Sequence, residues 1–174
     1  MHLTKSSIAR LCGLALGGLL AGCGSSGSGG GDATAPFVGT WTYSSGSIEP
    51  NCNIQGIPPF DLTGDTMTVT KVNGNTVATT LKGTGVMCNV NFTVSGDVAT
   101  AVAGQSCAVS TTVTIGTPMT IAVNIMITTW TLTVSGNTLS MAMTGTASAE
   151  GGVLTCTPTA SGTASKPADG GAGG

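Results

Sequence analysis

The feature that most constrains the fold of this chain is a strict alternation of apolar and polar residues, interrupted by short turn sequences. Residues 86–94 show it clearly, with apolar side chains at every second position. A period of two places the apolar residues on one face of a β-strand. No window of eleven residues keeps a helical period with good helix formers, so we predict an all-β chain. Glycine-centred tripeptides supply the left-handed backbone of tight hairpins; they are Asn73-Gly74-Asn75, Ser95-Gly96-Asp97 and Ser135-Gly136-Asn137.

The alternating segments follow one another closely enough for a single antiparallel meander of about eight or nine strands. The expected strands are residues 37–44, 65–72, 76–82, 86–94, 98–103, 107–115, 119–134, 139–143 and 153–163. A turn at Gly116-Thr117-Pro118 separates the sixth strand from the seventh. A meander of this size forms a small β-barrel or a β-sandwich, and both architectures remain open.

The longest expected strand changes parity along its length. Its apolar residues occupy odd positions from Ile121 to Ile127 and even positions from Trp130 to Val134. One extra residue near Thr128 would restore a common inward face, so the pattern predicts a β-bulge there. A long bent strand favours the barrel over the sandwich.

The first 22 residues are predicted to be a cleaved signal peptide. Lys5 and Arg10 are followed by an apolar run over residues 11–21 that is thinned by glycines. A positive segment followed by a short apolar core is the layout of a secretory signal. The run is shorter than the roughly 20 apolar residues of a membrane-spanning helix. An N-terminal anchor helix is the alternative.

The sequence Leu20-Ala21-Gly22-Cys23 resembles the lipobox of bacterial lipoproteins. The resemblance implies cleavage between Gly22 and Cys23, attachment of a thioether-linked lipid to Cys23, and acylation of the new N-terminus. A single acyl chain binds a membrane marginally, whereas several anchor a protein stably. Gly24 stands where an Asp would be the retention signal, which favours the outer membrane in a Gram-negative host. In a Gram-positive host the location would be the cell surface.

Removal of the signal changes the chemistry that the chain can perform. His2 and Arg10 are the only His and Arg of the sequence, and both lie in the signal. The mature chain keeps three Lys against seven acidic residues. Without an imidazole it lacks the base of Ser-His-Asp and Cys-His enzymes and any His-containing zinc site. Without clustered Lys or Arg it is not expected to bind nucleic acid.

The mature chain is expected to divide into three parts. Residues 23–35 hold the lipidated Cys23 and a Gly/Ser-rich tether, which behaves as a flexible coil. Residues 36–164 form one β domain. Residues 165–174 form a low-complexity tail that is predicted to be disordered.

Four cysteines remain in the β domain, and an even set in an exported chain indicates two disulfides. A hairpin about Gly96-Asp97 places Cys88 and Cys107 on the same face of neighbouring strands. A two-residue turn would make them diagonal neighbours, and a four-residue loop would put them opposite, within disulfide reach. We predict the pair Cys88–Cys107, which leaves Cys52–Cys156 by elimination. A metal-thiolate site is disfavoured because the spacings contain no CxxC pair.

The segment Gly39-Thr40-Trp41 looks like the G-x-W signature on the first strand of lipocalins. The resemblance implies a lipocalin-like barrel in which Trp41 plugs one end and Gly39 permits close packing. In lipocalins an Arg late in the chain packs over this Trp, and the mature chain contains no Arg. Trp41 as an ordinary core aromatic is the alternative.

Other residues that suggest chemistry have simpler interpretations. Asp61 and Asp65 form the only close carboxylate pair, and we interpret them as turn formers beside Gly64 rather than as a glycosidase pair. Met141 and Met143 alternate with Leu139, which favours core packing over copper ligation. We therefore assign no catalytic residue, metal ligand or cofactor.

Three functions remain for comparison with the structure. The first is a lipid-anchored envelope lipoprotein with a structural or interaction role and no catalysis. The second is a carrier of a small apolar ligand, which needs an interior cavity of several hundred Å³. The third is an enzyme that uses carboxylates alone. The expected partners are the membrane and an envelope protein or a small apolar ligand.

Overall fold

The computed structural model describes residues 31–53, 57–83, 86–115, 117–148 and 154–166. The predicted signal peptide and the lipobox-like sequence around Cys23 lie outside the described residues. The described chain is all-β, as predicted. Its strands are β1 (Gly39–Glu49), β2 (Phe60–Asp61), β3 (Thr66–Asn73), β4 (Thr76–Gly83), β5 (Val86–Ser95), β6 (Val98–Ala101), β7 (Ser106–Ile115), β8 (Thr117–Ser135), β9 (Thr138–Ser148), β10 (Thr155–Cys156) and β11 (Thr159–Ser165). No helix in this part of the chain has the length and apolar character needed to cross a membrane.

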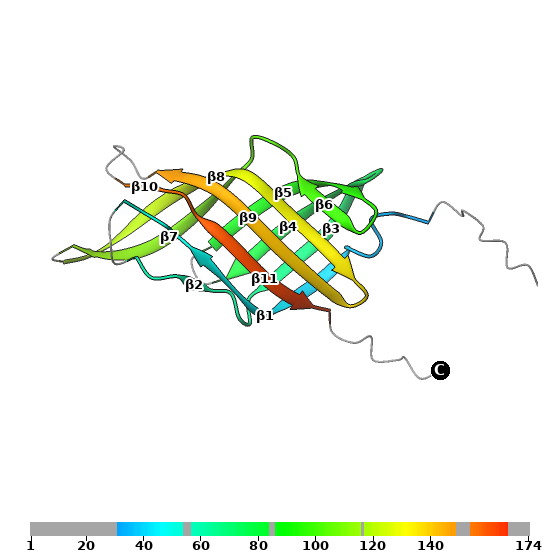
Figure 1. The fold of residues 1–174 in the computed structure, drawn as a ribbon, viewed down its shortest axis with the longest axis horizontal. Helices are drawn as coiled ribbons and strands as arrows, with labels where there is room; N and C mark the ends of the chain where they lie inside the picture. The colour runs from blue at the N-terminus through cyan, green and yellow to red at the C-terminus, as the bar shows by residue number, and fades with distance from the viewer. Residues whose placement is uncertain (1–30, 54–56, 84–85, 116, 149–153, 167–174) are drawn as a thin grey trace, which may run out of the picture.

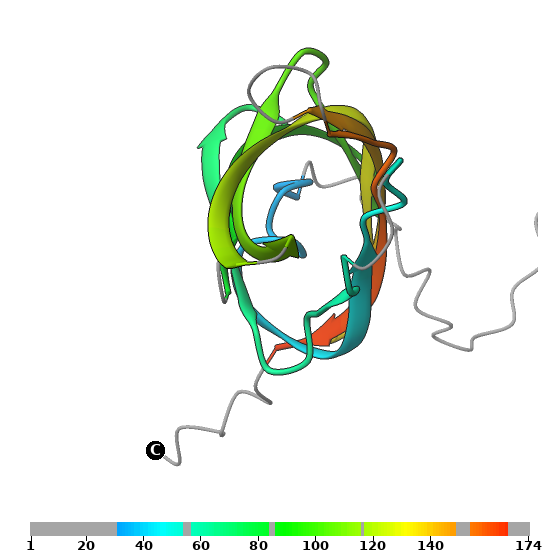
Figure 2. The same cartoon turned by 90° about the vertical axis from the view of Figure 1, so that its left-hand side faces the viewer.

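The strands form a closed barrel rather than a sandwich (Figures 1 and 2). Each strand pairs antiparallel with the next around the ring, from β1 through β3, β4 and β5, then β6 and β7, to β8, β9 and β11. Strand β11 then pairs antiparallel with β1, from Thr42↔Ser165 to Glu49↔Thr159. Because β6 and β7 share one place between β5 and β8, the described residues form an eight-strand barrel. The short strands β2 and β10 lie outside this ring.

The turns and the bulge lie where the sequence predicts them. Gly74, Gly96 and Gly136 have φ values of 45°, 59° and 58° in the hairpins β3–β4, β5–β6 and β8–β9. The register between β8 and β9 shifts between Ile127 and Thr129. The inward face of β8 therefore changes from Ile127 to Trp130, and both side chains are buried. The expected turn Gly116-Thr117-Pro118 is wrong at its last two residues, because Thr117 and Pro118 belong to β8. Gly116 lies outside the described residues.

The place shared by β6 and β7 contains a feature that the sequence did not predict. The β5–β6 hairpin is tight, with Ser95 opposite Val98, but the chain leaves the sheet between β6 and β7 and returns two residues out of register. The Gln105 side chain fills this gap by bonding to the backbone of Asn91. Its Oε1 accepts from Asn91 N at 2.8 Å and its Nε2 donates to Asn91 O at 2.8 Å. The side-chain amide thus replaces a missing strand residue.

The barrel interior is filled by the inward residue of each alternating pair. The largest fully buried side chains are Trp41, Trp130, Tyr43, Phe37, Phe92, Leu62, Met67, Leu132, Leu139, Val69, Val77 and Val90. Thr79 is a buried polar residue on the inward face, and its Oγ1 donates to Val90 O at 3.3 Å. Met141 and Met143 are buried in the same core, as predicted.

The folded region is longer at both ends than the sequence suggests. Thr34, expected in the tether, is fully buried, and Val38 N bonds to Thr34 O at 3.2 Å. Ser165, expected in the tail, pairs with Thr42 and Thr138. The barrel therefore includes part of the segment through which it would be tethered.

Candidate functional site

One end of the barrel, which we call the capped end, is closed by the segment that precedes β1. The Asp32 carboxylate accepts hydrogen bonds from the Thr34 backbone at 3.0 Å and from its hydroxyl at 2.6 Å, which fixes a turn. The turn directs Phe37 into the barrel, where it is fully buried. Trp41 Nε1 donates to Phe37 O at 2.8 Å. Trp41 thus lies under a cap made by its own preceding residues.

Lys166 completes this end from the other terminus of the folded region. Its Nζ lies 4.5 Å from the centroid of the Trp41 ring and donates to Pro36 O at 2.9 Å. A Cβ atom on Gly39 would approach Lys166 Cε to 3.2 Å, and Gly39 has a φ of 136°. Glycine is therefore needed both for the backbone and for the passage of the lysine. The lysine occupies the place over Trp41 that the lipocalin resemblance gives to an arginine.

The role of Lys166 was not predicted from the sequence, because the lipocalin resemblance implies an arginine at this place. The position of Lys166 in the sequence is the signal that could have indicated it. Lys166 directly follows β11, and β11 pairs antiparallel with β1, the strand that carries Trp41. Gly39 and Trp41, which sequence analysis assigned to barrel-end packing, lie together at this end.

Both disulfides lie toward the opposite end of the barrel, which we call the mouth. Cys88 of β5 is bonded to Cys107 of β7 inside the barrel. The pairs Val86↔Val109 and Met87↔Ala108 continue to put these cysteines directly opposite each other. The two-register shift at Gln105 produces this alignment, so a tight turn and opposite cysteines occur together.

The second disulfide joins Cys52, in the segment that follows β1, to Cys156 of β10, at a sequence separation of 104. Asn51 adopts a left-handed conformation with a φ of 46°. Its side chain donates to Thr157 O at 3.3 Å, and its carbonyl accepts from Thr157 N at 3.1 Å. Asn53 bonds to Thr155 through its backbone N–H and its Oδ1, both at 3.0 Å. The rim of the mouth is therefore fixed by backbone, side chain and sulfur together.

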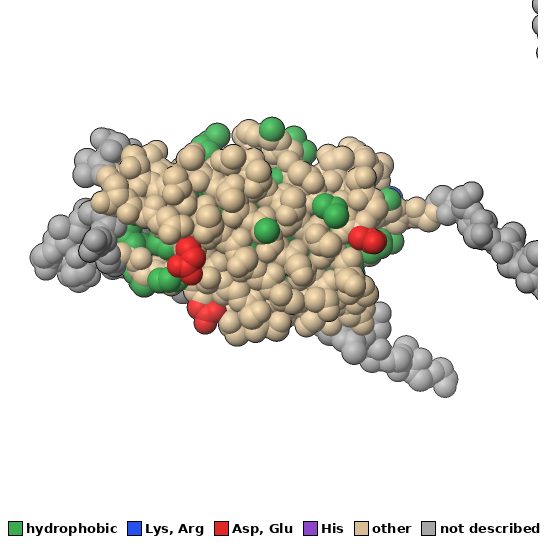
Figure 3. All heavy atoms as spheres, in the orientation of Figure 1, with side chains coloured by type: hydrophobic (Ala, Val, Ile, Leu, Met, Phe, Trp, Pro, Cys, Tyr) green, Lys and Arg blue, Asp and Glu red, His purple; other side chains and the backbone are tan. Residues whose placement is uncertain are grey.

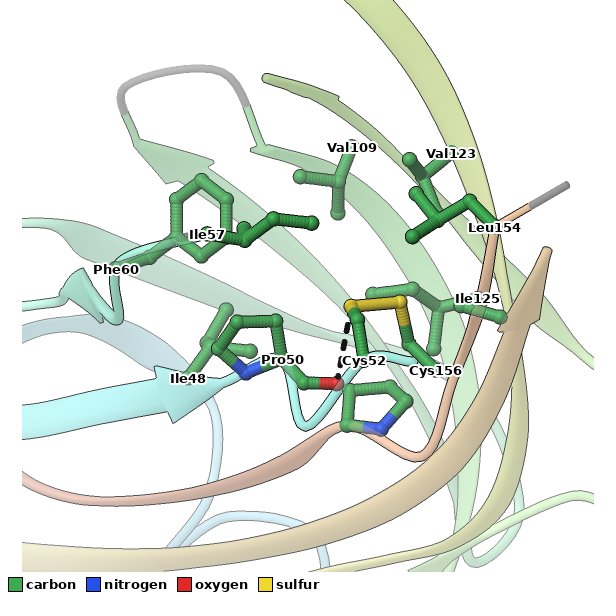
Figure 4. Close-up of a pocket in the computed structure, with 12 residues that line it drawn as sticks. Ile48, Pro50, Cys52, Ile57, Phe60, Val109, Val123, Ile125, Leu154 and Cys156 are labelled. Carbon is green, nitrogen blue, oxygen red and sulfur yellow. Dashed lines mark hydrogen bonds between the residues drawn. A yellow bond between two sulfur atoms is a disulfide. The ribbon is translucent and has the colours of Figure 1, made fainter. Parts of the chain in front are cut away.

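An apolar pocket opens inside this rim (Figure 4). Its lining comes from Ile48, Pro50, Cys52, Ile57, Phe60, Val109, Val123, Ile125, Ala147, Leu154, Cys156 and Pro158. The Cys52 sulfur lies 3.6 Å from Pro50 O. This is a packing contact, because a disulfide sulfur carries no hydrogen to donate.

The space that the described residues enclose within the barrel is small. The mouth pocket holds about 30 Å³ of free volume, and a second cavity below it, beside Trp130 and the Cys88–Cys107 disulfide, holds about 20 Å³. A single water molecule in the liquid occupies about 30 Å³. The Trp130 Nε1 group is buried and has no hydrogen-bond partner in the described part of the chain, and the Trp130 ring packs edge-on against Phe92 with ring centroids 5.4 Å apart.

Two carboxylates stand on the outer side of the mouth. Asp61 of β2 lies opposite Ser47 of β1, and the Ser47 hydroxyl donates to Glu49 Oε1 at 2.9 Å. The Asp61 carboxylate accepts from Thr63 N at 2.8 Å, and the hydrogen bonds from Thr63 hold its pKa below the usual value. Burial, and then the negative charge of Asp61, raise the pKa of Asp65. Asp61 thus forms the turn that we expected of it.

The described residues contain no group of three or more His, Cys, Asp or Glu side chains arranged for a metal ion. The ion pair that they do contain, Lys71–Asp32, lies at the capped end. The hydrogen bond from Lys71, followed by those from Thr34, lowers the pKa of Asp32 to about 2.

Comparisons with known proteins give little beyond this description. No protein-family model matches the chain, and no curated protein matches it. Among solved structures there is a partial likeness to a mutant of the vaccine antigen Transferrin Binding Protein B from Haemophilus parasuis Hp5, with 11% identity and a TM-score of 0.31. The likeness covers 75% of this chain and 28% of that one. A likeness at this level carries no functional argument.

Proposed function

We propose that the protein is a lipid-anchored envelope lipoprotein whose barrel has a structural or interaction role and no catalytic activity. The anchor is the lipidated Cys23, and Gly24 favours the outer membrane. The packing of residues 32–38 supports this proposal, because it firmly joins the segment that follows Cys23 to the barrel. Because the described chain enters the barrel at the capped end, the mouth is the end of the barrel farther from the anchor.

The observation that carries the interaction role is the close packing of the interior among the described residues. The two interior cavities that these residues line, of about 30 and 20 Å³, are roughly an order of magnitude smaller than a site for a small molecule. The outer surface in turn carries few charges. Outward positions along β8 and β9 are mostly Thr and Ser, and polar uncharged side chains and backbone cover most of the face in Figure 3. A neutral, hydroxyl-rich surface is suited to contact with other envelope components.

The anchor is tested by replacing its acceptor, with the variant Cys23→Ser expressed in the native host. We expect the wild-type protein to fractionate with membranes and to carry fatty acid on a chain that begins at Cys23. The variant should keep its signal peptide or appear in the soluble envelope fraction. Native mass spectrometry of the extracted wild-type protein reports both the acyl groups and the two disulfides. A wild-type chain that begins at Met1 without fatty acid would refute the anchor.

A second candidate function is the transport of a small apolar ligand, and one observation favours it. Trp130 lines the smaller apolar cavity, and its Nε1 has no hydrogen-bond partner among the described residues, where a buried donor without a partner costs roughly 1–3 kcal/mol. A ligand with one hydrogen-bond acceptor would satisfy it, provided that the interior opens. The same native mass spectra decide the matter, since a carrier would retain a stoichiometric small molecule and an interaction protein would not.

A further inference from the structure

We propose that the mouth pocket is a docking site for a polypeptide segment of a partner protein, one that presents an aliphatic side chain flanked by Lys or Arg. This inference rests on the proposed function only for the interaction role of the barrel. The binding chemistry is argued from the residues at the mouth.

The aliphatic part of this chemistry follows from the pocket lining. Every lining residue is apolar, and several rim residues, among them Ile57 and Phe60, are only partly buried although they pack against the core. Apolar surface kept partly open at a rigid rim gains free energy when it is covered. The free volume of about 30 Å³ accepts the tip of one side chain and not an acyl chain.

The cationic part follows from the two rim carboxylates. Ile48 and Phe60 line the pocket, and the residues that follow them, Glu49 and Asp61, belong to the outer face. In the described part of the chain, neither carboxylate takes part in an ion pair. Figure 3 shows acidic side chains beside apolar ones at this end of the molecule. A positive charge next to the inserted side chain would complement both groups.

The rim is built to keep this shape without a ligand. The Cys52–Cys156 disulfide and the hydrogen bonds of Asn51 and Asn53 hold β1 against β10 around the pocket. A preformed site loses less conformational entropy on binding than one that must be ordered. The pocket therefore suits recognition of a short, exposed sequence.

A second copy of this chain is the competing occupant. Among the described residues, Val72 is the most exposed large hydrophobic residue, at 52%, and it follows Lys71, so this segment also presents an aliphatic side chain beside a positive charge. The Lys71 ammonium is already paired with Asp32, however. It therefore complements the carboxylates at the mouth of a second copy less well than an unpaired Lys or Arg of a partner would.

The test uses the mature chain with Cys23→Ser, so that no lipid is present. Amide chemical shifts are followed by NMR during titration with three acetylated peptides, Gly-Ser-Lys-Leu-Lys-Ser-Gly, its Glu-Leu-Glu analogue and its Lys-Ser-Lys analogue. We expect saturable shifts at Ile57 and Phe60 with the first peptide, and at least tenfold weaker binding of the other two. Equal binding of the three peptides, or shifts confined to the capped end, would overturn the proposal.

Matched variants separate the two parts of the proposal. The double variant Glu49→Gln, Asp61→Asn keeps the hydrogen-bond acceptors for Ser47 and Thr63 and should bring the Lys and Glu peptides within about twofold of each other. Asp97→Asn removes one negative charge in the β5–β6 turn at the other end and should preserve the tenfold preference. Ile57→Asp should abolish binding while the remaining spectrum is unchanged. A concentration-dependent dimer that Ile57→Asp dissociates would instead assign the pocket to self-association and refute the partner segment. Since no step needs the anchor, loss of peptide binding and loss of membrane attachment are separate results.

Discussion

At the scale of single residues, the capped end shows that position decides more than residue type. A lysine reaches over the Trp41 ring because the last strand ends beside it and because Gly39 leaves a path for its side chain. An ammonium over an indole ring is attracted by the ring quadrupole, as a guanidinium is. The same ammonium ties the two ends of the folded chain together through Pro36 O.

Lys166→Met should lower the free energy of unfolding by about 2–4 kcal/mol, the sum of about 0.5–1 kcal/mol for the cation–π contact and about 1.5–3 kcal/mol for one hydrogen bond from a charged donor. Urea unfolding followed by tryptophan fluorescence measures this change. Lys71→Met is the matched control, because it removes the same charge from the same end but affects only a surface ion pair with Asp32. An equal loss in both variants would show that net charge, and not the contact with Trp41, is responsible.

Asp32 makes the stability of the capped end depend on pH. Its pKa in the folded chain is about 2, below the ordinary value of 3.8, so its contribution is fully present above pH 3.8. The contribution is lost as the pH falls through about 2. NMR titration of the Asp32 carboxyl should give a midpoint near 2 in the wild type and a higher one in Lys71→Met. Lys82→Met, which removes a lysine that does not contact Asp32, should leave the midpoint unchanged.

At the scale of strands and turns, the local pattern predicts some features and not others. The parity of β8 and the glycines at the three tight turns are properties of short segments, so the alternation and the tripeptides reveal them. The break between β6 and β7 depends on the register of three strands at once. Gln105 is an ordinary polar residue in the sequence, and its function appears only when Asn91 lies across from it.

The same distinction applies to the candidate site. The even cysteine count predicts two disulfides, and both are present. The mouth pocket could not be predicted, because its lining comes from six strands and the loops beside them. No single segment of the sequence therefore contains a pattern that predicts the pocket.

Deletion of Thr128 tests the bulge directly. Without the extra residue, the inward sets around Val123 and around Leu132 cannot face the core together, so one of them is turned toward solvent. The deletion variant should lose cooperative unfolding in urea. Thr129→Ala keeps the chain length and removes only the exposed hydrogen bond to the Thr144 hydroxyl, so it should unfold like the wild type. A deletion variant with a normal transition would mean that the register is set elsewhere.

At the scale of the whole molecule, closure of the barrel depends on the pairing of β11 with β1. All other neighbours in the ring also follow one another along the chain, whereas this pair joins its two ends. Closure leaves no free edge in the ring, and open sheet edges promote aggregation. The last strand is therefore needed to close the barrel.

Truncation after Pro158 removes β11 and should expose the edges of both β1 and β9. We expect an aggregated product in size-exclusion chromatography. Truncation after Lys166 keeps every strand of the barrel together with the Lys166 contact with Trp41, so it should remain monomeric with an unchanged unfolding midpoint. A soluble, monomeric product of the first truncation would show that closure is dispensable.

The antiparallel pairing of β1 and β11 also has a mechanical consequence. Gly39 begins β1 and Ser165 ends β11 at the same end of the barrel, where Lys166 contacts Pro36. A force that pulled the two ends apart would open the seam one hydrogen bond after another, which is a weak geometry. A force applied at the N-terminal end alone would instead pass first into the turn at residues 32–38, which its own hydrogen bonds hold to the barrel. The fold therefore resists a pull on its N-terminal end better than a pull on both ends.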